Sequence, residues 1–128
     1  MSRRISRILH PVVPGIADTV RAEGGTTVYV SGTVGLRPGG EPAADFAEQC
    51  SLAIASLEAS LAGQNASLAD IVRLNVYVVG LDDEKMHTWH RVRDTRFDHA
   101  HSPASTLLGV GRLYSADVAI EIEATAVL

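Results

Sequence analysis

The residues of this chain that could most plausibly do chemistry lie in its last quarter. Pro103-Ala104-Ser105-Thr106 reads as a turn that leads into a short strand, and a second strand follows that carries Glu121 and Glu123. Residues two apart on a strand share one face. A partly buried carboxylate on such a face could act as a general acid or base. The alternative is that it forms an ion pair or a hydrogen bond at a subunit interface.

A glycine-rich segment near the middle of the chain is a second candidate. Gly32, Gly35, Gly39 and Gly40 follow one another closely, with Arg37 between them. Such spacing predicts a loop that bends sharply or brings its backbone close to another group.

The histidines do not predict a metal site. His87, His90, His99 and His101 lie close in the sequence, and the first two could share a helix face. No nearby cysteine or acid completes a ligand set. We therefore expect no metal, and we interpret these histidines as surface residues.

Bulk properties limit the class of protein. The 128 residues predict a single domain spanning 1–128. The net charge of −4 argues against nucleic acid as a partner, because nucleic-acid binding needs a basic face. No apolar run is long enough to cross a membrane, and the N-terminus has no signal-peptide pattern. The single cysteine, Cys50, fits a reducing compartment and a buried site, so we expect a cytoplasmic protein.

The elements that must position these residues alternate between strands and helices. Strands are expected at 4–9, 19–22, 27–32, 71–79, 106–110 and 118–128. Helices are expected after Asp45, ending at Gly63, and from Asp82 through Phe97. This order predicts an α+β fold in which both helices cover one face of the sheet.

The two long strands have one apolar face and one mixed face. The apolar rows are expected to be Val72, Leu74, Val76 and Val78 in one strand, and Val118, Ile120, Ile122, Ala124 and Ala126 in the other. The opposite rows mix polar, charged and apolar residues. A mixed sheet face of this kind favours packing on another subunit.

Several segments together resemble the RidA/YjgF family, the reactive intermediate deaminases, which are also described as endoribonuclease L-PSP-like. They are Val28-Tyr29-Val30-Ser31-Gly32, the helix from Glu48-Gln49-Cys50 to Leu57, the stretch from Ser67 to Tyr77, and Ile120-Glu121-Ile122-Glu123-Ala124. The resemblance implies a chorismate-mutase-like fold with a six-stranded mixed sheet. It also implies a homotrimer with three clefts between subunits, and cofactor-independent hydrolysis of enamines and imines to ketoacids and ammonia.

The family's site carries over only in part. Glu123 matches the glutamate that positions water, and Glu121 is expected to be structural. Ser105 stands where the family has an arginine that binds the substrate carboxylate. The family's tyrosine is also missing, because the matching segment of this chain is approximately Ile16-Ala17-Asp18. Arg37 is the candidate replacement for the missing cation.

The remaining contacts of the predicted site follow from the same match. Ser105 and Thr106 would orient the substrate, and backbone N–H groups around Gly32 and Leu107 would receive developing charge. Ile16 would line the cleft.

The residues leave two main functions open. One is a divergent deaminase that acts on a small imine or enamine not anchored by the usual arginine–carboxylate contact. The other is a non-catalytic trimer that binds a small metabolite and regulates a partner. A third function, ribonuclease, is disfavoured by the acidic charge of the chain.

Overall fold

A computed structural model describes residues 2–128 as a six-stranded sheet with two long helices. The elements in chain order are β1 (Arg4–Leu9), β2 (Ala17–Glu23), β3 (Thr27–Val34), α1 (Phe46–Ala62), β4 (Ile71–Val79), α2 (Asp83–Asp94), β5 (Ala104–Val110) and β6 (Ile120–Val127). Short 3₁₀ turns precede β4 and β5.

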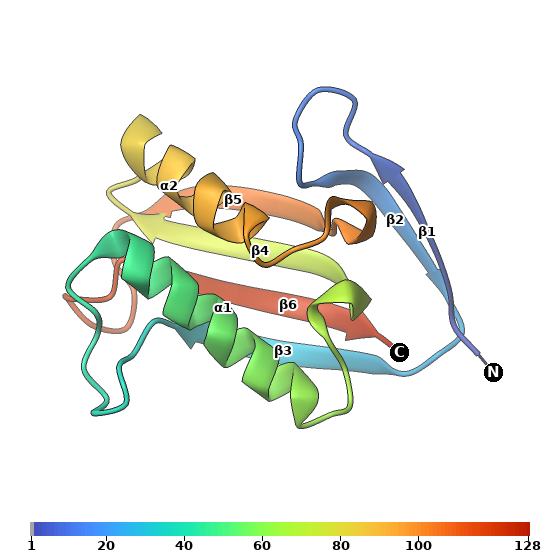
Figure 1. The fold of residues 1–128 in the computed structure, drawn as a ribbon, viewed down its shortest axis with the longest axis horizontal. Coiled ribbons are helices and arrows are strands. Elements are labelled where there is room, and N and C mark those ends of the chain that lie inside the picture. The colour runs from blue at the N-terminus through green and yellow to red at the C-terminus, as the bar shows by residue number, and fades with distance from the viewer. Residues whose placement is uncertain (1) are drawn as a thin grey trace.

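The sheet is mixed, and its strand order is β1-β2-β5-β4-β6-β3. β5 runs parallel to β4 and, at one residue pair, to β2, whereas the other neighbours are antiparallel. Both helices lie on the same face of the sheet, with α1 beside α2 (Figure 1). The predicted α+β architecture is therefore confirmed, and one face of the sheet is left without a helix.

Local capping explains where the helices begin. The Asp45 carboxylate accepts a hydrogen bond of 3.1 Å from the backbone N–H of Glu48, at the start of α1. Asp82 accepts one of 2.9 Å from Lys85 at the start of α2. These short acidic side chains satisfy N–H groups that have no partner inside the helix.

The end of α1 is as predicted, with Gly63 as its C-cap, whereas the end of α2 differs from the sequence-based prediction. α2 ends at Asp94 rather than at Phe97, because the Thr95 hydroxyl donates to the carbonyl of Val92 and competes with a further turn. After α1 the chain turns at Asn65, which has a left-handed φ of 59°, whereas Gly63 stays right-handed. The turn therefore depends on an asparagine that tolerates this conformation.

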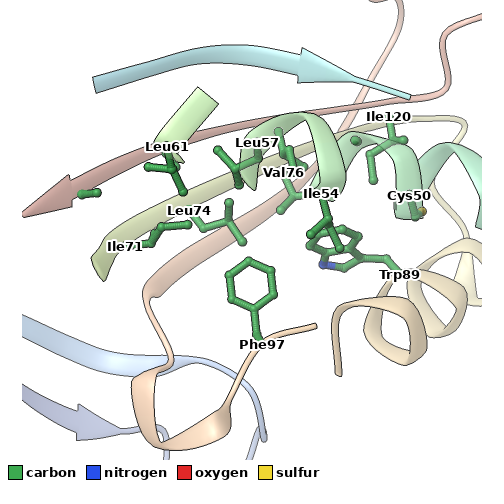
Figure 2. Packing of buried hydrophobic residues seen from close by; sticks show 14 of the residues in the cluster. Cys50, Ile54, Leu57, Leu61, Ile71, Leu74, Val76, Trp89, Phe97 and Ile120 are labelled. Carbon is green, nitrogen blue, oxygen red and sulfur yellow. The ribbon is translucent and has the colours of Figure 1, made fainter. Parts of the chain in front are cut away.

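The core lies between the helices and one face of β4 and β6 (Figure 2). Ile54, Leu57 and Leu61 of α1 are fully buried in this core, and Trp89 of α2 exposes only 2% of its surface. The predicted apolar row of β6 is confirmed. The row of β4 needs a correction, because a register shift between Ile71 and Arg73 buries Ile71 and leaves Val72 only half-buried.

No helix among residues 2–128 has the length and apolar character that a membrane span requires.

Cys50 lies in this core with no exposed surface, as predicted. Burial, with a smaller effect from the Asp45 charge, raises the pKa of its thiol to about 12. Because only the thiolate reacts quickly, we expect no reaction of the native protein with an aromatic disulfide reagent at mildly alkaline pH. The denatured chain should release one equivalent of the coloured thiol, and a Cys50→Ala variant none. Fast reaction of the native protein would contradict the buried position of Cys50.

Candidate functional site

The sheet face without helices collects the polar side chains of the central strands. The register places Asn75 of β4 opposite Glu123 of β6, and Thr106 of β5 opposite Asn75 on the other side. Paired residues of neighbouring strands point to the same face. Thr106, Asn75 and Glu123 therefore form one row across the open face, and Ala104, Arg73 and Thr125 form the next.

Glu123 is held by two side chains of β4. The Tyr77 hydroxyl donates to its Oε1 at 2.6 Å, and the Asn75 Nδ2 donates to the same oxygen at 3.2 Å. Within residues 2–128 no donor meets the other oxygen, Oε2. The carboxylate thus has a fixed orientation and one oxygen available to another molecule.

The hydrogen bonds to Glu123 affect the pKa of Tyr77 and the amide orientation of Asn75. The hydrogen bond to Glu123 raises the pKa of the Tyr77 phenol, and desolvation and the negative charges of Glu123 and Glu121 act in the same direction. The Asn75 Oδ1 is buried and finds no partner in the part of the chain that the structure describes. Its amide orientation is therefore set by the bond from Nδ2 to Glu123.

A depression of about 300 Å³ lies over this row. Its polar lining comes from Tyr29 and Ser31 of β3, Arg73 and Asn75 of β4, and Glu123 and Thr125 of β6. A cation, a carboxylate, an amide and hydroxyl groups thus surround one small volume. Such a lining suits a small polar molecule better than an apolar one.

Glu121 lies on the same face, opposite Tyr77. Its carboxylate packs so closely on Gly32 that a methyl group at position 32 would overlap it. The glycine at this position therefore allows the close approach of Glu121 rather than a special backbone angle, since Gly32 is absent from the glycines with positive φ.

Two other predicted site residues, Ser105 and Leu107, lie on the opposite face of the sheet from Glu123. Ser105 pairs with the buried Leu74, so its side chain is on the helix-covered face, as is the partly buried Leu107. A strand cannot point two successive side chains to one face. Ser105 and Thr106 therefore cannot both contact a ligand held by Glu123 in the same subunit.

Arg37 and Ile16 are also separated from Glu123. The Arg37 guanidinium pairs with Glu48 of α1 at 3.0 Å. Ile16 lines a second depression of about 210 Å³, together with His10 and His99. A site that joins Ser105, Arg37 or Ile16 to Glu123 would need a second subunit.

Residues 2–128 contain no group of three or more histidine, cysteine, aspartate or glutamate side chains that could hold a metal ion.

Sequence reasoning did not assign a site role to Arg73, Asn75 or Tyr77. The signal was present, because the three alternate along β4 with Leu74 and Val76. Only the register with β6 shows that they surround Glu123.

Comparison with known proteins points to one family. Residues 17–128 match the sequence model of the family described as endoribonuclease L-PSP. TdcF of Escherichia coli K12, assigned by its name to the reactive intermediate deaminases, is 33% identical over 106 residues, which cover 80% of each chain.

Solved structures agree with this match. YyfB from Yersinia pestis, of the Rid protein family, is 28% identical, and the alignment covers all of both chains with a TM-score of 0.81. Escherichia coli TdcF with bound serine is 30% identical over 93% of this chain and 89% of that chain, with a TM-score of 0.72. The chain therefore belongs to the RidA/YjgF (endoribonuclease L-PSP) family, as its sequence predicted.

Proposed function

We propose that this protein hydrolyses small imines, or enamines after tautomerisation, to carbonyl compounds and ammonia, with Glu123 as the acid–base group. The observation that carries the proposal is the orientation of Glu123, whose Oε1 is held by Tyr77 and Asn75 beside a polar depression. Membership in a family with a relative named as a reactive intermediate deaminase supports the reaction class. No cofactor is required by this chemistry.

In the proposed reaction, Glu123 Oε2 accepts a proton from water as the water oxygen bonds to the imine carbon. The imine nitrogen takes up a proton from solvent, so the C=N double bond becomes a single bond. The resulting carbinolamine then breaks its C–N bond. Its nitrogen leaves as ammonia with the proton returned by Glu123, and its hydroxyl releases a proton to solvent as it becomes the carbonyl group. The carboxylate ends as it began, which is what general acid–base catalysis requires.

The proposed substrate is small and is not anchored at position 105. A serine hydroxyl there offers one ordinary hydrogen bond where an arginine would offer a charge-assisted, bidentate contact. Loss of a charged contact of this kind weakens binding by about 1.5–3 kcal/mol. The structure of TdcF contains bound serine, and we propose ligands of similar size for this chain. Thr106, and backbone N–H groups near Gly32 and Leu107, would orient them.

The second candidate function is a non-catalytic trimer that binds a small metabolite and regulates a partner. The observation that favours it is Ser105 itself, because its small neutral side chain lies on the face opposite Glu123. A protein of this kind would bind its ligand without turnover.

The role of Glu123 can be tested by ammonia release from imines generated in situ by an amino-acid oxidase. Glu123→Gln keeps the size of the side chain and removes the proton acceptor. We expect its rate to fall by roughly 10²–10⁴-fold, the usual contribution of general acid–base catalysis.

Glu121→Gln is the matched control, because Glu121 lies on the same strand and face. We expect its rate to fall by less than that of Glu123→Gln. A larger loss in Glu121→Gln than in Glu123→Gln would transfer the acid–base role to Glu121. A wild type without turnover on any imine would favour the binding function.

Tyr77 should titrate at unusually high pH. Its raised pKa means that the phenol stays protonated, and keeps donating to Glu123, beyond the ordinary value of about 10. Its contribution to stability is thus present below that pH and is lost as pH rises through the higher, folded-state pKa. Phenolate absorbance of the wild type minus that of Tyr77→Phe should show this late ionisation. Glu123→Gln should move it to lower pH, and an unmoved curve would mean that the two groups do not interact.

We further propose that the protein is a homotrimer assembled through the open sheet face. Tyr29 and Leu108 support this, because they expose 80% and 49% of their surface on that face. Sedimentation equilibrium should give about three times 13.6 kDa. Leu108→Arg should lower the mass, whereas Tyr114→Arg, at an exposed tyrosine in the loop before β6, should not. A wild-type mass of one chain would contradict the assembly.

A further inference from the structure

Arg73 lies beside Glu123 in the same depression. It is an exposed residue of β4 and pairs with Ala104 on one side and with Thr125 on the other, so its side chain is on the open sheet face. Glu123 is its diagonal neighbour, two residues before Thr125 on β6. Diagonal neighbours on one sheet face are typically about 7–8 Å apart at Cα, within reach of long side chains.

Within the described residues the Arg73 guanidinium nevertheless makes no ion pair. Its Nη2 donates to the Thr106 hydroxyl at 3.1 Å, and within residues 2–128 no carboxylate oxygen lies within 4.0 Å of it. A guanidinium has five N–H donors in a planar fork. Most of this hydrogen-bonding capacity, and the full positive charge, is thus available to another molecule.

Neighbouring side chains keep the two opposite charges apart. Thr106 draws Arg73 toward β5, while Tyr77 and Asn75 hold Glu123 Oε1 on β4. Arg73 and Glu123 both line the depression, and within residues 2–128 no hydrogen-bond donor meets Glu123 Oε2. A small depression with a cation and a carboxylate in its lining is complementary to a small zwitterion.

We propose that Arg73 is the carboxylate anchor of this site, so that the ligand is a small α-amino or α-imino acid. Its carboxylate would accept two parallel hydrogen bonds from Arg73, and its N–H group would donate to Glu123 Oε2. Ser31 and Thr125 line the same depression and suit a short polar side chain. This inference rests on the proposed function and deepens it by naming, at a position other than 105, the residue that holds the ligand's carboxylate.

Arg73 provides, on the face of Glu123, the positive charge that the neutral Ser105 lacks. Ser105 is on the helix-covered face of β5, where it cannot share a ligand with Glu123 of the same subunit. Arg73 is on the adjacent strand and on the face of Glu123. The cation and the acid–base group are thereby brought to one ligand within one chain.

NMR chemical-shift titration with three stable probes tests this assignment. L-alanine carries both charges, L-alaninamide lacks the carboxylate, and propionate lacks the ammonium group. Arg73→Gln should weaken L-alanine and propionate by roughly 10- to 150-fold, the loss of one charged contact, and should leave L-alaninamide within a factor of about two. Arg73→Lys should retain part of the affinity, because it keeps the charge but not the fork.

Arg112→Gln is the matched control. Arg112 is an exposed arginine that donates only to the carbonyl of its neighbour Leu113, and it lies outside the depression. Its substitution should leave the affinity for all three probes unchanged. Equal losses in Arg73→Gln and Arg112→Gln would show a general effect of net charge and would overturn the anchor.

Two further measurements separate this inference from the proposed function. Turnover that depends on Glu123 but is unchanged in Arg73→Gln would overturn the anchor and leave the deaminase intact. Binding of L-alanine that depends on Arg73, in a protein without turnover, would support the anchor and remove the deaminase. If Arg73→Gln lowers the sedimentation mass and weakens all three probes equally, Arg73 is an interface residue and the anchor is overturned.

Discussion

The antiparallel register between β4 and β6 is the constraint on which the rest of the structure depends. It stacks Leu74 against Ala124 and Val76 against Ile122 beneath the helices. The same register necessarily sets Asn75 opposite Glu123 on the other face. A slip of one residue would turn every apolar side chain of β4 toward the open face. Burial of the core therefore fixes the hydrogen bonds of Glu123, although Glu123 lies on the opposite face of the sheet.

This coupling explains what the sequence could predict. A strand with clean alternation, such as β6, reveals its buried face directly, and Asp45 and Asp82 mark the starts of the helices because capping is local. The first residues of β4 were misassigned because the shift at Ile71 arises from pairing with Ala126, a partner more than fifty residues away. Alternation within one strand carries no information about such a shift.

The site was less predictable than the fold for a related reason. Matching by position selected Ser105 and Arg37, but position along the chain does not state which face a side chain occupies or which charge it meets. Ser105 turns out to share a face with Leu74, and Arg37 is neutralised by Glu48. Arg73 and Tyr77 became visible only when the neighbouring strands showed which carboxylate they flank. The proposed assembly of subunits depends on contacts between chains, which the pairing of strands within one chain does not determine.

Arg73, which has no ion pair within residues 2–128, would link the proposed ligand to the proposed assembly. In bulk water two opposite charges 4 Å apart interact by about 1 kcal/mol, and at an effective dielectric constant of 20 by about 4 kcal/mol. Covering the open face with a second copy would therefore strengthen every contact inside the depression. The same cover would remove water from the guanidinium, and a buried charge without a partner costs several kcal/mol. An assembly through this face must consequently supply Arg73 with a carboxylate. A zwitterionic ligand provides one while its ammonium group meets Glu123, so that ligand binding and subunit packing would each stabilise the other.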